Sequence, residues 1–250
     1  MKKAIFFLST ISLFALTSCS SDDNSSTDTV TASDVLVKRI IHTQEDPDGF
    51  NDIITYTYDG NKLLEANYLD GTKEKYYYTG NLITKVEYIY GGEVEEQDVF
   101  VYNANGKLIE YKNQDLIEDY EDRYLYVHNA DNTITETHQG NSSTITLENG
   151  EISKVVQTGS ETYKYTYDSK NSPFKNVTGY AEIVYAFDGD FQLQGRSRNI
   201  ALIRNETRGF DYMKNTFQYN SNDYPTRAVS EAVFNNPNNV ETMTVQYFYE

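Results

Sequence analysis

Acidic side chains gather in two stretches of this 250-residue chain. The first stretch holds Glu93, Glu95, Glu96 and Asp98, and the second holds Asp115, Glu118, Asp119, Glu121 and Asp122. Two carboxylates that face one cleft are the groups that hydrolyse glycosidic bonds. Charge of this density also solvates exposed faces and protects the edges of sheets. The second interpretation fits better, so we predict no catalytic residue and keep a surface hydrolase with paired carboxylates as the alternative.

Histidine and cysteine are too scarce for most other site chemistry, with three His and one Cys. His128 could act as a general base oriented by the carboxylate of Asp131. The chain has no Gly-x-Ser-x-Gly motif, however, to supply a serine nucleophile that such a base would activate. The run from Asp46 to Asp52 is rich in oxygen ligands, yet it lacks the ligand order of a calcium-binding EF-hand. We therefore expect no metal and no cofactor.

Tyrosine is the unusual component, with 23 copies and no Trp. Tyrosine rings in a row can stack on sugars or peptides, since each has an apolar body and a polar tip. The residues with this potential are Tyr124, Tyr126, His128, Tyr163 and Tyr165. The competing interpretation makes the same rows the core of a rolled sheet. Regular alternation favours the core, and it leaves a few tyrosines at an open end to bind a ligand.

Period-two alternation indicates that the elements carrying these residues are antiparallel strands. Val86, Tyr88 and Tyr90 share one face, whereas Lys85 and Glu87 share the other. No stretch has a helical period, so we predict an all-β chain of roughly 12–15 strands at the usual spacing along such chains. An open sheet of that width tends to curl, split or close. The expected fold is a long antiparallel β-meander, rolled or barrel-like, with a β-sandwich as the alternative.

The strands repeat as hairpins built on a Tyr-x-Tyr-Asp/Asn motif followed by a Gly-containing turn. The anchor tyrosines Tyr58, Tyr78, Tyr102 and Tyr126 lie 20, 24 and 24 residues apart. The pattern breaks over residues 169–215. We interpret that segment as two ordinary strands, 183–187 and 200–204, joined by a polar loop. The alternative is a longer excursion packed on the sheet or over one open end.

The N-terminus has the organisation of an export signal. Lys2 and Lys3 precede an apolar run from Ala4 to Leu16, which is too short to span a bilayer. Leu16-Thr17-Ser18-Cys19 follows, and it resembles the lipobox of bacterial lipoproteins. The resemblance implies cleavage after Ser18 and acylation of Cys19, which anchors the protein to a membrane. Loss of residues 1–18 takes the formal charge from −17 to −19, which disfavours nucleic acid as a partner.

The domain plan is therefore a signal peptide (1–18), an acylated Cys with a flexible tether (19–33) and one all-β repeat domain (34–250). The tyrosine units resemble tyrosine–aspartate (YD/RHS-type) repeats. With the lipobox and the acidic tether, they resemble Bacteroidetes outer-membrane lipoproteins of uncharacterised function. That resemblance implies an outer-membrane location, with exposure at the cell surface as an option, and it supplies no catalytic residue. We predict a non-catalytic binding or scaffolding protein whose ligand is a glycan, a peptide or an envelope protein, with a purely structural surface protein as a further alternative.

Overall fold

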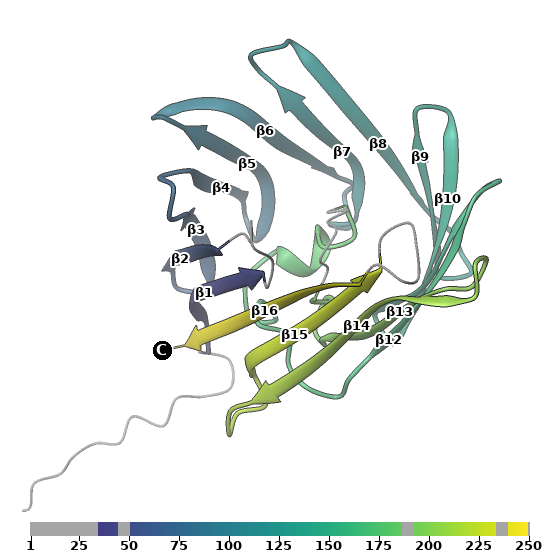
Figure 1. Cartoon of the computed structure of the whole chain (residues 1–250). Coiled ribbons are helices and arrows are strands. Elements are labelled where there is room, and N and C mark those ends of the chain that lie inside the picture. The colour runs from purple at the N-terminus through teal and green to yellow at the C-terminus, as the bar shows by residue number, and fades with distance from the viewer. Residues whose placement is uncertain (1–34, 45–50, 187–192, 234–239, 250) are drawn as a thin grey trace, which may run out of the picture. The chain divides into compact units, whose positions relative to one another are not determined.

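The computed structural model describes residues 35–44, 51–186, 193–233 and 240–249. Their strands form one closed antiparallel barrel of sixteen (Figure 1). The first eight are β1 (Val37–Gln44), β2 (Asn51–Asp59), β3 (Lys62–Asn67), β4 (Lys73–Thr79), β5 (Leu82–Tyr90), β6 (Glu93–Tyr102), β7 (Leu108–Asp115) and β8 (Tyr120–His128). The others are β9 (Thr133–His138), β10 (Asn141–Glu148), β11 (Glu151–Gln157), β12 (Thr162–Tyr167), β13 (Ile200–Asn205), β14 (Phe210–Tyr219), β15 (Pro225–Val233) and β16 (Val240–Tyr249). No described helix is long and apolar enough to cross a membrane.

Each strand pairs with its neighbours in sequence, and β1 pairs with β16 to close the barrel. The closing register runs from Val37 opposite Tyr249 to Gln44 opposite Met243. The predicted meander is confirmed, and the alternative of a β-sandwich is wrong. The prediction of 12–15 strands is too low, because strands such as β9 and β10 carry Thr and Ser in place of the tyrosines that mark the other hairpins.

The aromatic face of the sheet points into the barrel, as the alternation predicted. Val86 is 1% exposed and Tyr247 is 4% exposed. One apolar cluster includes Leu63, Val245 and Tyr247, and a second includes Ile83, Leu108 and other inward residues. Burying this surface is the main force that holds the sheet in a roll.

The repeat motif places a β-bulge just before the turn. The register shifts at the second tyrosine of the motif in several hairpins, including Tyr58, Tyr78 and Tyr102. Bulges increase the local twist and bend of a strand, which helps a wide sheet to close. Two of these tyrosines also bond to a backbone carbonyl of the preceding strand: Tyr58 Oη donates to Val37 O of β1 at 2.7 Å, and Tyr102 Oη donates to Ile83 O of β5 at 2.6 Å.

The fourth anchor was assigned incorrectly. His128, and not Tyr126, occupies the anchor position of its hairpin, since Asn129 follows it as Asn103 follows Tyr102. Its Nε2 atom lies 2.7 Å from Leu108 O, which repeats the hydrogen bond of the anchor tyrosines. No hydrogen bond joins His128 to Asp131 among the described residues, and Asp131 instead accepts one from the backbone N–H of Thr133.

The segment between β12 and β13 enters the barrel and fills one end of it, where it lies inside the ring of strands (Figure 1). We call the described part of residues 168–199 the plug. Phe174 and Val177 pack into the first apolar cluster, and Ile183 packs into the second. The first strand expected in this segment, 183–187, is wrong, because residues 180–182 form a short 3-10 helix, η1 (Tyr180–Glu182), whereas the second strand is present as β13.

The plug is fixed to the tight turns at that end, which we call the plug end. Thr178 N donates to Asn61 O at 2.8 Å, and Asn171 N donates to Asp223 O at 2.9 Å. Gly179 passes so close to the β4–β5 turn that a Cβ atom would lie 2.7 Å from the backbone oxygen of Asn81. Its positive φ of 78° also favours glycine.

Glu151 holds the other side of the plug from the start of β11. This carboxylate is 3% exposed. It accepts hydrogen bonds from the backbone N–H groups of Arg196 at 2.7 Å, Ser197 at 2.8 Å and Arg198 at 3.1 Å, and from the Ser197 hydroxyl at 2.6 Å. A buried charge is stable only when it is hydrogen-bonded in this way.

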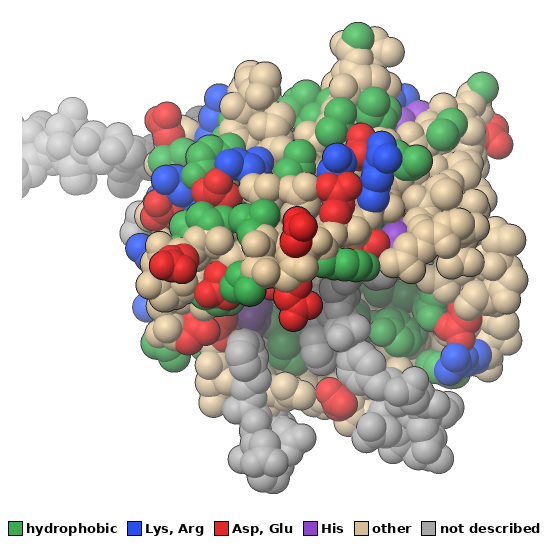
Figure 2. Space-filling view, turned by 90° about the horizontal axis from the view of Figure 1, so that it is seen from above, with side chains coloured by type: hydrophobic (Ala, Val, Ile, Leu, Met, Phe, Trp, Pro, Cys, Tyr) green, Lys and Arg blue, Asp and Glu red, His purple; other side chains and the backbone are tan. Residues whose placement is uncertain are grey.

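Polar side chains dominate the outer wall of the barrel. Ion pairs there join Arg123 to Glu110 at 2.5 Å and Arg204 to Asp211 at 2.7 Å. Figure 2 shows one face on which acidic, basic and hydrophobic side chains are mixed. Some apolar residues also point outward, such as Val127, which is 59% exposed.

Candidate functional site

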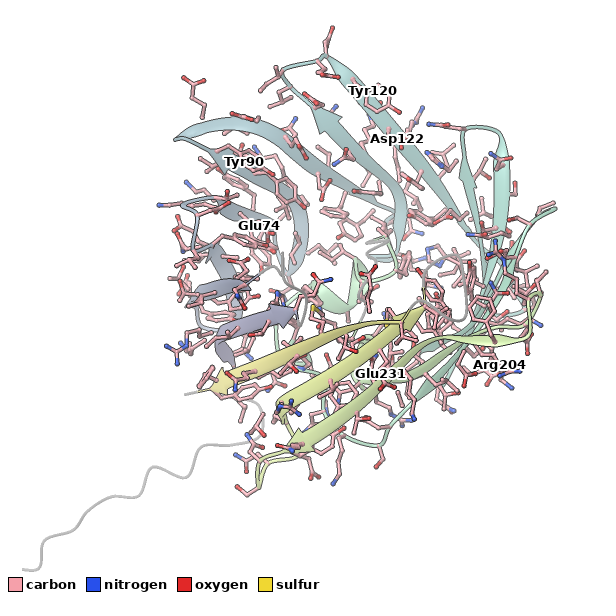
Figure 3. All side chains as sticks on the ribbon, in the orientation of Figure 1. Glu74, Tyr90, Tyr120, Asp122, Arg204 and Glu231 are labelled. Atoms are coloured by element: carbon pink, nitrogen blue, oxygen red, sulfur yellow. The ribbon has the colours of Figure 1, made fainter. Side chains whose placement is uncertain are left out.

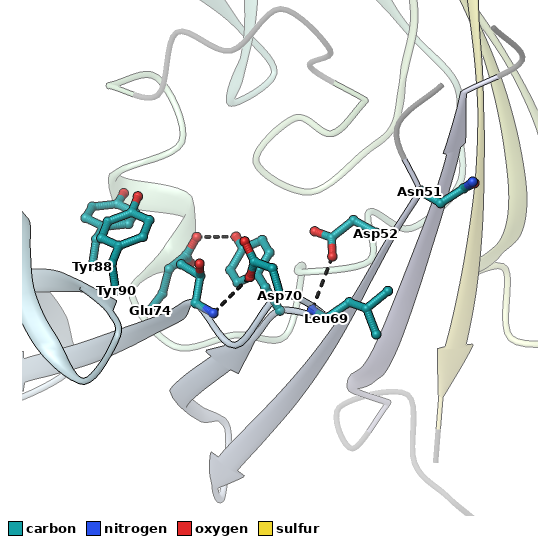
Figure 4. A pocket seen from close by; sticks show the side chains of 9 residues that line it. Asn51, Asp52, Leu69, Asp70, Glu74, Tyr88 and Tyr90 are labelled. Carbon is teal, nitrogen blue, oxygen red and sulfur yellow. Dashed lines mark hydrogen bonds between the residues drawn. The ribbon is translucent and has the colours of Figure 1, made fainter. Parts of the chain in front are cut away.

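A cavity of about 570 Å³ lies at the end of the barrel opposite the plug end, which we call the cavity end. The starts of β2 and β4, the β3–β4 turn and the end of β5 form it (Figure 4). Asp52, Glu74, Tyr88 and Tyr90 come from strands, whereas Tyr68 and Asp70 come from the β3–β4 turn. The lining residues are Asn51, Asp52, Tyr68, Leu69, Asp70, Thr72, Glu74, Tyr88 and Tyr90.

Glu74 is the central carboxylate of this cavity. Its two carboxylate oxygens accept hydrogen bonds from the hydroxyls of Tyr68 and Tyr76. Burial raises the pKa of Glu74, and the nearby charge of Asp98 raises this pKa further, against the lowering effect of the two phenols. Figure 3 labels Glu74 and Tyr90 on the neighbouring strands β4 and β5. Both hydrogen-bond partners of Glu74 are neutral, so neither places a positive charge beside its carboxylate.

Asp98 lies on β6 and is 1% exposed. It accepts hydrogen bonds from Tyr88 Oη at 2.7 Å, Tyr111 Oη at 2.9 Å and Asn113 Nδ2 at 3.0 Å. Burial raises the pKa of Asp98 in spite of these donors. Tyr88 also lines the cavity, so it connects Asp98 to the cavity wall.

A smaller chamber of about 210 Å³ adjoins the cavity and reaches the plug. It shares Tyr68, Glu74 and Tyr88 with the larger cavity, and Phe174, Tyr180 and Gln194 of the plug help to line it. The other lining residues are Tyr56 and Tyr76. Within the described ranges the hydroxyls of Tyr56 and Tyr90 make no hydrogen bond, so both remain available to a ligand.

The five residues predicted to bind a ligand lie outside this cavity, on β8 and β12, which three strands separate. Tyr124 stacks on the ring of His138 with centroids 3.9 Å apart, and Tyr126 is buried against Tyr185. Tyr163 and Tyr165 pack on the cluster around Ile203. His128 lines a separate cavity of about 450 Å³ at the plug end, beside Lys107 and Arg196.

The acidic stretches serve different purposes. Asp98 points inward, whereas Glu93 and Glu121 are exposed. Asp122 accepts a hydrogen bond from His138 Nε2 at 2.6 Å, and Figure 3 labels it with Tyr120 on β8. Sequence reasoning missed Glu74. Its position was a usable signal, because it shares the inward alternation of Tyr76 and Tyr78 while Lys73 and Lys75 point outward. The part of the run Asp46–Asp52 that spans residues 46–50 lies outside the described residues.

No protein-family model matches the chain, and no curated protein sequence matches it. Among solved structures, the fold is similar to that of a porin-like protein from Bacteroides uniformis ATCC 8492. The match has a TM-score of 0.54 at 13% sequence identity, and it covers 86% of this chain and 98% of that chain. The two proteins share a barrel fold. At this identity the likeness concerns the fold alone.

The described strands differ from a transmembrane barrel in the direction of their side chains. Such barrels place an apolar band outward and polar residues inward. Here Tyr76 and Tyr78 of β4 face inward, whereas Lys73 and Lys75 face outward. Each lysine at the centre of a bilayer would cost about 2–4 kcal/mol. The outward side of β4 is therefore suited to water and not to lipid.

Proposed function

We propose that this protein is a lipid-anchored envelope protein that binds a small ligand in the cavity at the cavity end of its barrel. The observation that carries the proposal is the cavity itself, in which carboxylates and tyrosine rings converge on a space of about 570 Å³. Concave sites of this size with a few convergent polar groups are typical of ligand-binding proteins. Catalysis is not required by any feature of the proposal.

The proposed anchor rests on the lipobox Leu16-Thr17-Ser18-Cys19, which lies outside the described residues. The chain enters the barrel at the plug end, where Asn176 Nδ2 donates to Val35 O at 3.0 Å. An acylated Cys19 would therefore be attached through the tether to the end opposite the cavity.

Two measurements test this function. Cys19→Ala should move the protein from the membrane fraction to the soluble fraction of cells, because the proposed acyl chains are lost. A screen of melting temperature against sugars, peptides and amines should reveal a concentration-dependent rise for one class. Retention of Cys19→Ala in membranes would contradict the anchor, and no shift with any class would contradict ligand binding.

A surface hydrolase is the second candidate, and the raised pKa of the Glu74 and Asp98 carboxyls favours it, because general acids in glycosidases have raised pKa values. Both carboxylates accept hydrogen bonds from tyrosines, which suits recognition better than proton transfer to a substrate. Hydrolysis of chromogenic glycosides by the natural protein, abolished in both Glu74→Gln and Asp98→Asn, would establish the enzyme. The absence of turnover across the panel would exclude glycoside hydrolysis.

A further inference from the structure

We infer that the ligand of the cavity is an organic cation, such as a quaternary ammonium compound or a short polyamine. This inference rests on the proposed binding function and names the class of ligand. It combines the charge of the cavity wall, the aromatic rings in it and the charge around its mouth.

The described wall of the cavity is acidic, and none of its nine residues is basic. Asp52, Asp70 and Glu74 contribute three carboxylates, and the other six residues of the lining are neutral. The partners of Asp52 are the backbone N–H groups of Ile53 at 2.8 Å and Leu69 at 3.3 Å. His42 is an ionisable neighbour of Asp52, and burial lowers the pKa of His42 against the raising effect of the Asp52 charge. A cation in the cavity would supply the compensation that the protein does not.

Aromatic rings supply the second element of recognition. Tyr68, Tyr88 and Tyr90 line the outer chamber, and Tyr56 and Tyr180 line the inner one. A cation over the face of such a ring is attracted by the negative charge of the ring face, and quaternary ammonium compounds are bound by cages of this composition. The hydrogen-bond-free hydroxyls of Tyr56 and Tyr90 can accept from the N–H groups of a primary amine.

The mouth of the cavity is also acidic. Asp70 is exposed on the β3–β4 turn at the mouth, and Lys73 beside it is exposed too. Glu93, Glu118 and Asp119 are exposed on the next two hairpin tips at the same end of the barrel, so acidic groups outnumber basic ones among these residues. Such a mouth attracts cations and accelerates their association at low ionic strength. A neutral sugar would gain nothing from this field, and an anion would be repelled.

The lining suits an organic cation better than a metal ion. Among the described residues, no three His, Cys, Asp or Glu side chains are grouped so that they could hold one metal. Both carboxylate oxygens of Glu74 are engaged by phenol hydroxyls, which a directly bound metal would have to displace. A diffuse ammonium charge can sit beside this hydrogen-bonded carboxylate without such displacement.

Isothermal titration of the full chain, purified from membranes in detergent, tests the inference. The probes are choline, spermidine, the uncharged choline analogue 3,3-dimethylbutan-1-ol and a set of neutral sugars. We expect binding of at least one cation and none of the uncharged analogue. Glu74→Gln should weaken cation binding about tenfold, since it removes a charge-assisted contact. Glu231→Gln, on the exposed outer face of β15, is the matched control and should leave binding unchanged.

The outcomes of this titration distinguish failure of the cation inference from failure of the proposed binding function. Binding of a neutral sugar or of the uncharged analogue, with no cation bound, would overturn the cation and leave the binding function intact. If Glu231→Gln weakened cation binding as much as Glu74→Gln, the measured binding would come from general surface charge, and this result would also overturn the inference. If no probe binds, the inference and the proposed site both fail. Tyr90→Leu provides a second variant should Glu74→Gln not fold, and loss of its ring should weaken cation binding about threefold or more.

Discussion

Individual tyrosine and carboxylate side chains determine the chemistry of the cavity, because their hydrogen bonds are made to one another. Glu74 and Asp98 together accept bonds from four tyrosine hydroxyls, those of Tyr68, Tyr76, Tyr88 and Tyr111. Burial raises the pKa of both carboxyls, and the hydroxyls oppose that rise. The protonation state of each carboxyl is therefore coupled to folding and to binding.

Glu74 should make stability depend on pH. Its pKa is raised in the folded protein by burial and by Asp98, so the folded state holds its proton to a higher pH than the unfolded state does. Stability from this group is therefore greatest below the unfolded pKa, about 4.3, and falls as pH rises through the folded value. The groups around it are the phenols of Tyr56, Tyr68, Tyr76, Tyr88, Tyr90 and Tyr180 and the carboxyl of Asp98.

Urea unfolding of the natural protein and of Glu74→Gln between pH 4 and pH 8 measures this effect. The free energy of unfolding of the natural protein, relative to Glu74→Gln, should fall as pH rises. Glu231→Gln should show no such trend. A difference that is constant with pH would mean that Glu74 has an ordinary pKa in the folded protein.

Tyr102 tests the hydrogen bonds that the anchor tyrosines make to a backbone carbonyl of the preceding strand. Tyr102→Phe removes the bond from its hydroxyl to Ile83 O and should lower the free energy of unfolding by about 1 kcal/mol. The change should appear as a lower urea midpoint with an unaltered slope. Tyr120→Phe is the control, since Tyr120 is 52% exposed at a hairpin tip. If both variants lowered the free energy of unfolding equally, the hydrogen bond of the anchor tyrosine would contribute no specific stability.

At the scale of elements, the hairpins follow from local sequence and the plug does not. Alternation at Val86, Tyr88 and Tyr90 fixes which face of β5 turns inward, and it is visible in the sequence alone. The plug has no period, and its place depends on contacts with distant turns, such as that of Thr178 with Asn61. Glu74 was overlooked although its partner Tyr68 lies in the same hairpin, because its neighbour Asp98 comes from β6, two strands further along the sheet.

The plug should depend on one carboxylate. Glu151→Gln turns one acceptor oxygen into a donor that faces the N–H groups of residues 196–198, and it removes the charge that strengthens the remaining bonds. We expect a loss of about 2–3 kcal/mol in the free energy of unfolding. Hydrogen exchange of the amides at 195–199 should become faster than that of β14 and β15. Uniformly faster exchange over all strands would show that the plug and the barrel unfold as one unit.

At the scale of the whole molecule, the barrel directs its aromatic face inward and its charged face outward. Sixteen strands in a porin surround an aqueous channel. Here the plug occupies one end of the interior, and the cavity with Glu74 occupies the other. The outer wall carries charges that would be costly in lipid, so contact with the membrane is assigned to the proposed anchor at Cys19.

The inward direction of the tyrosine rows is the central claim, and spectrophotometric titration of tyrosinate tests it most directly. Burial raises the pKa of Tyr78 and Tyr180 to about 12 and that of Tyr56, Tyr88 and Tyr247 still higher. Between pH 9 and pH 11 only a small fraction of the 23 tyrosines should ionise, and the remainder should ionise together when the protein unfolds at higher pH. Ionisation of most tyrosines near the ordinary pKa of about 10 in the folded protein would contradict the account.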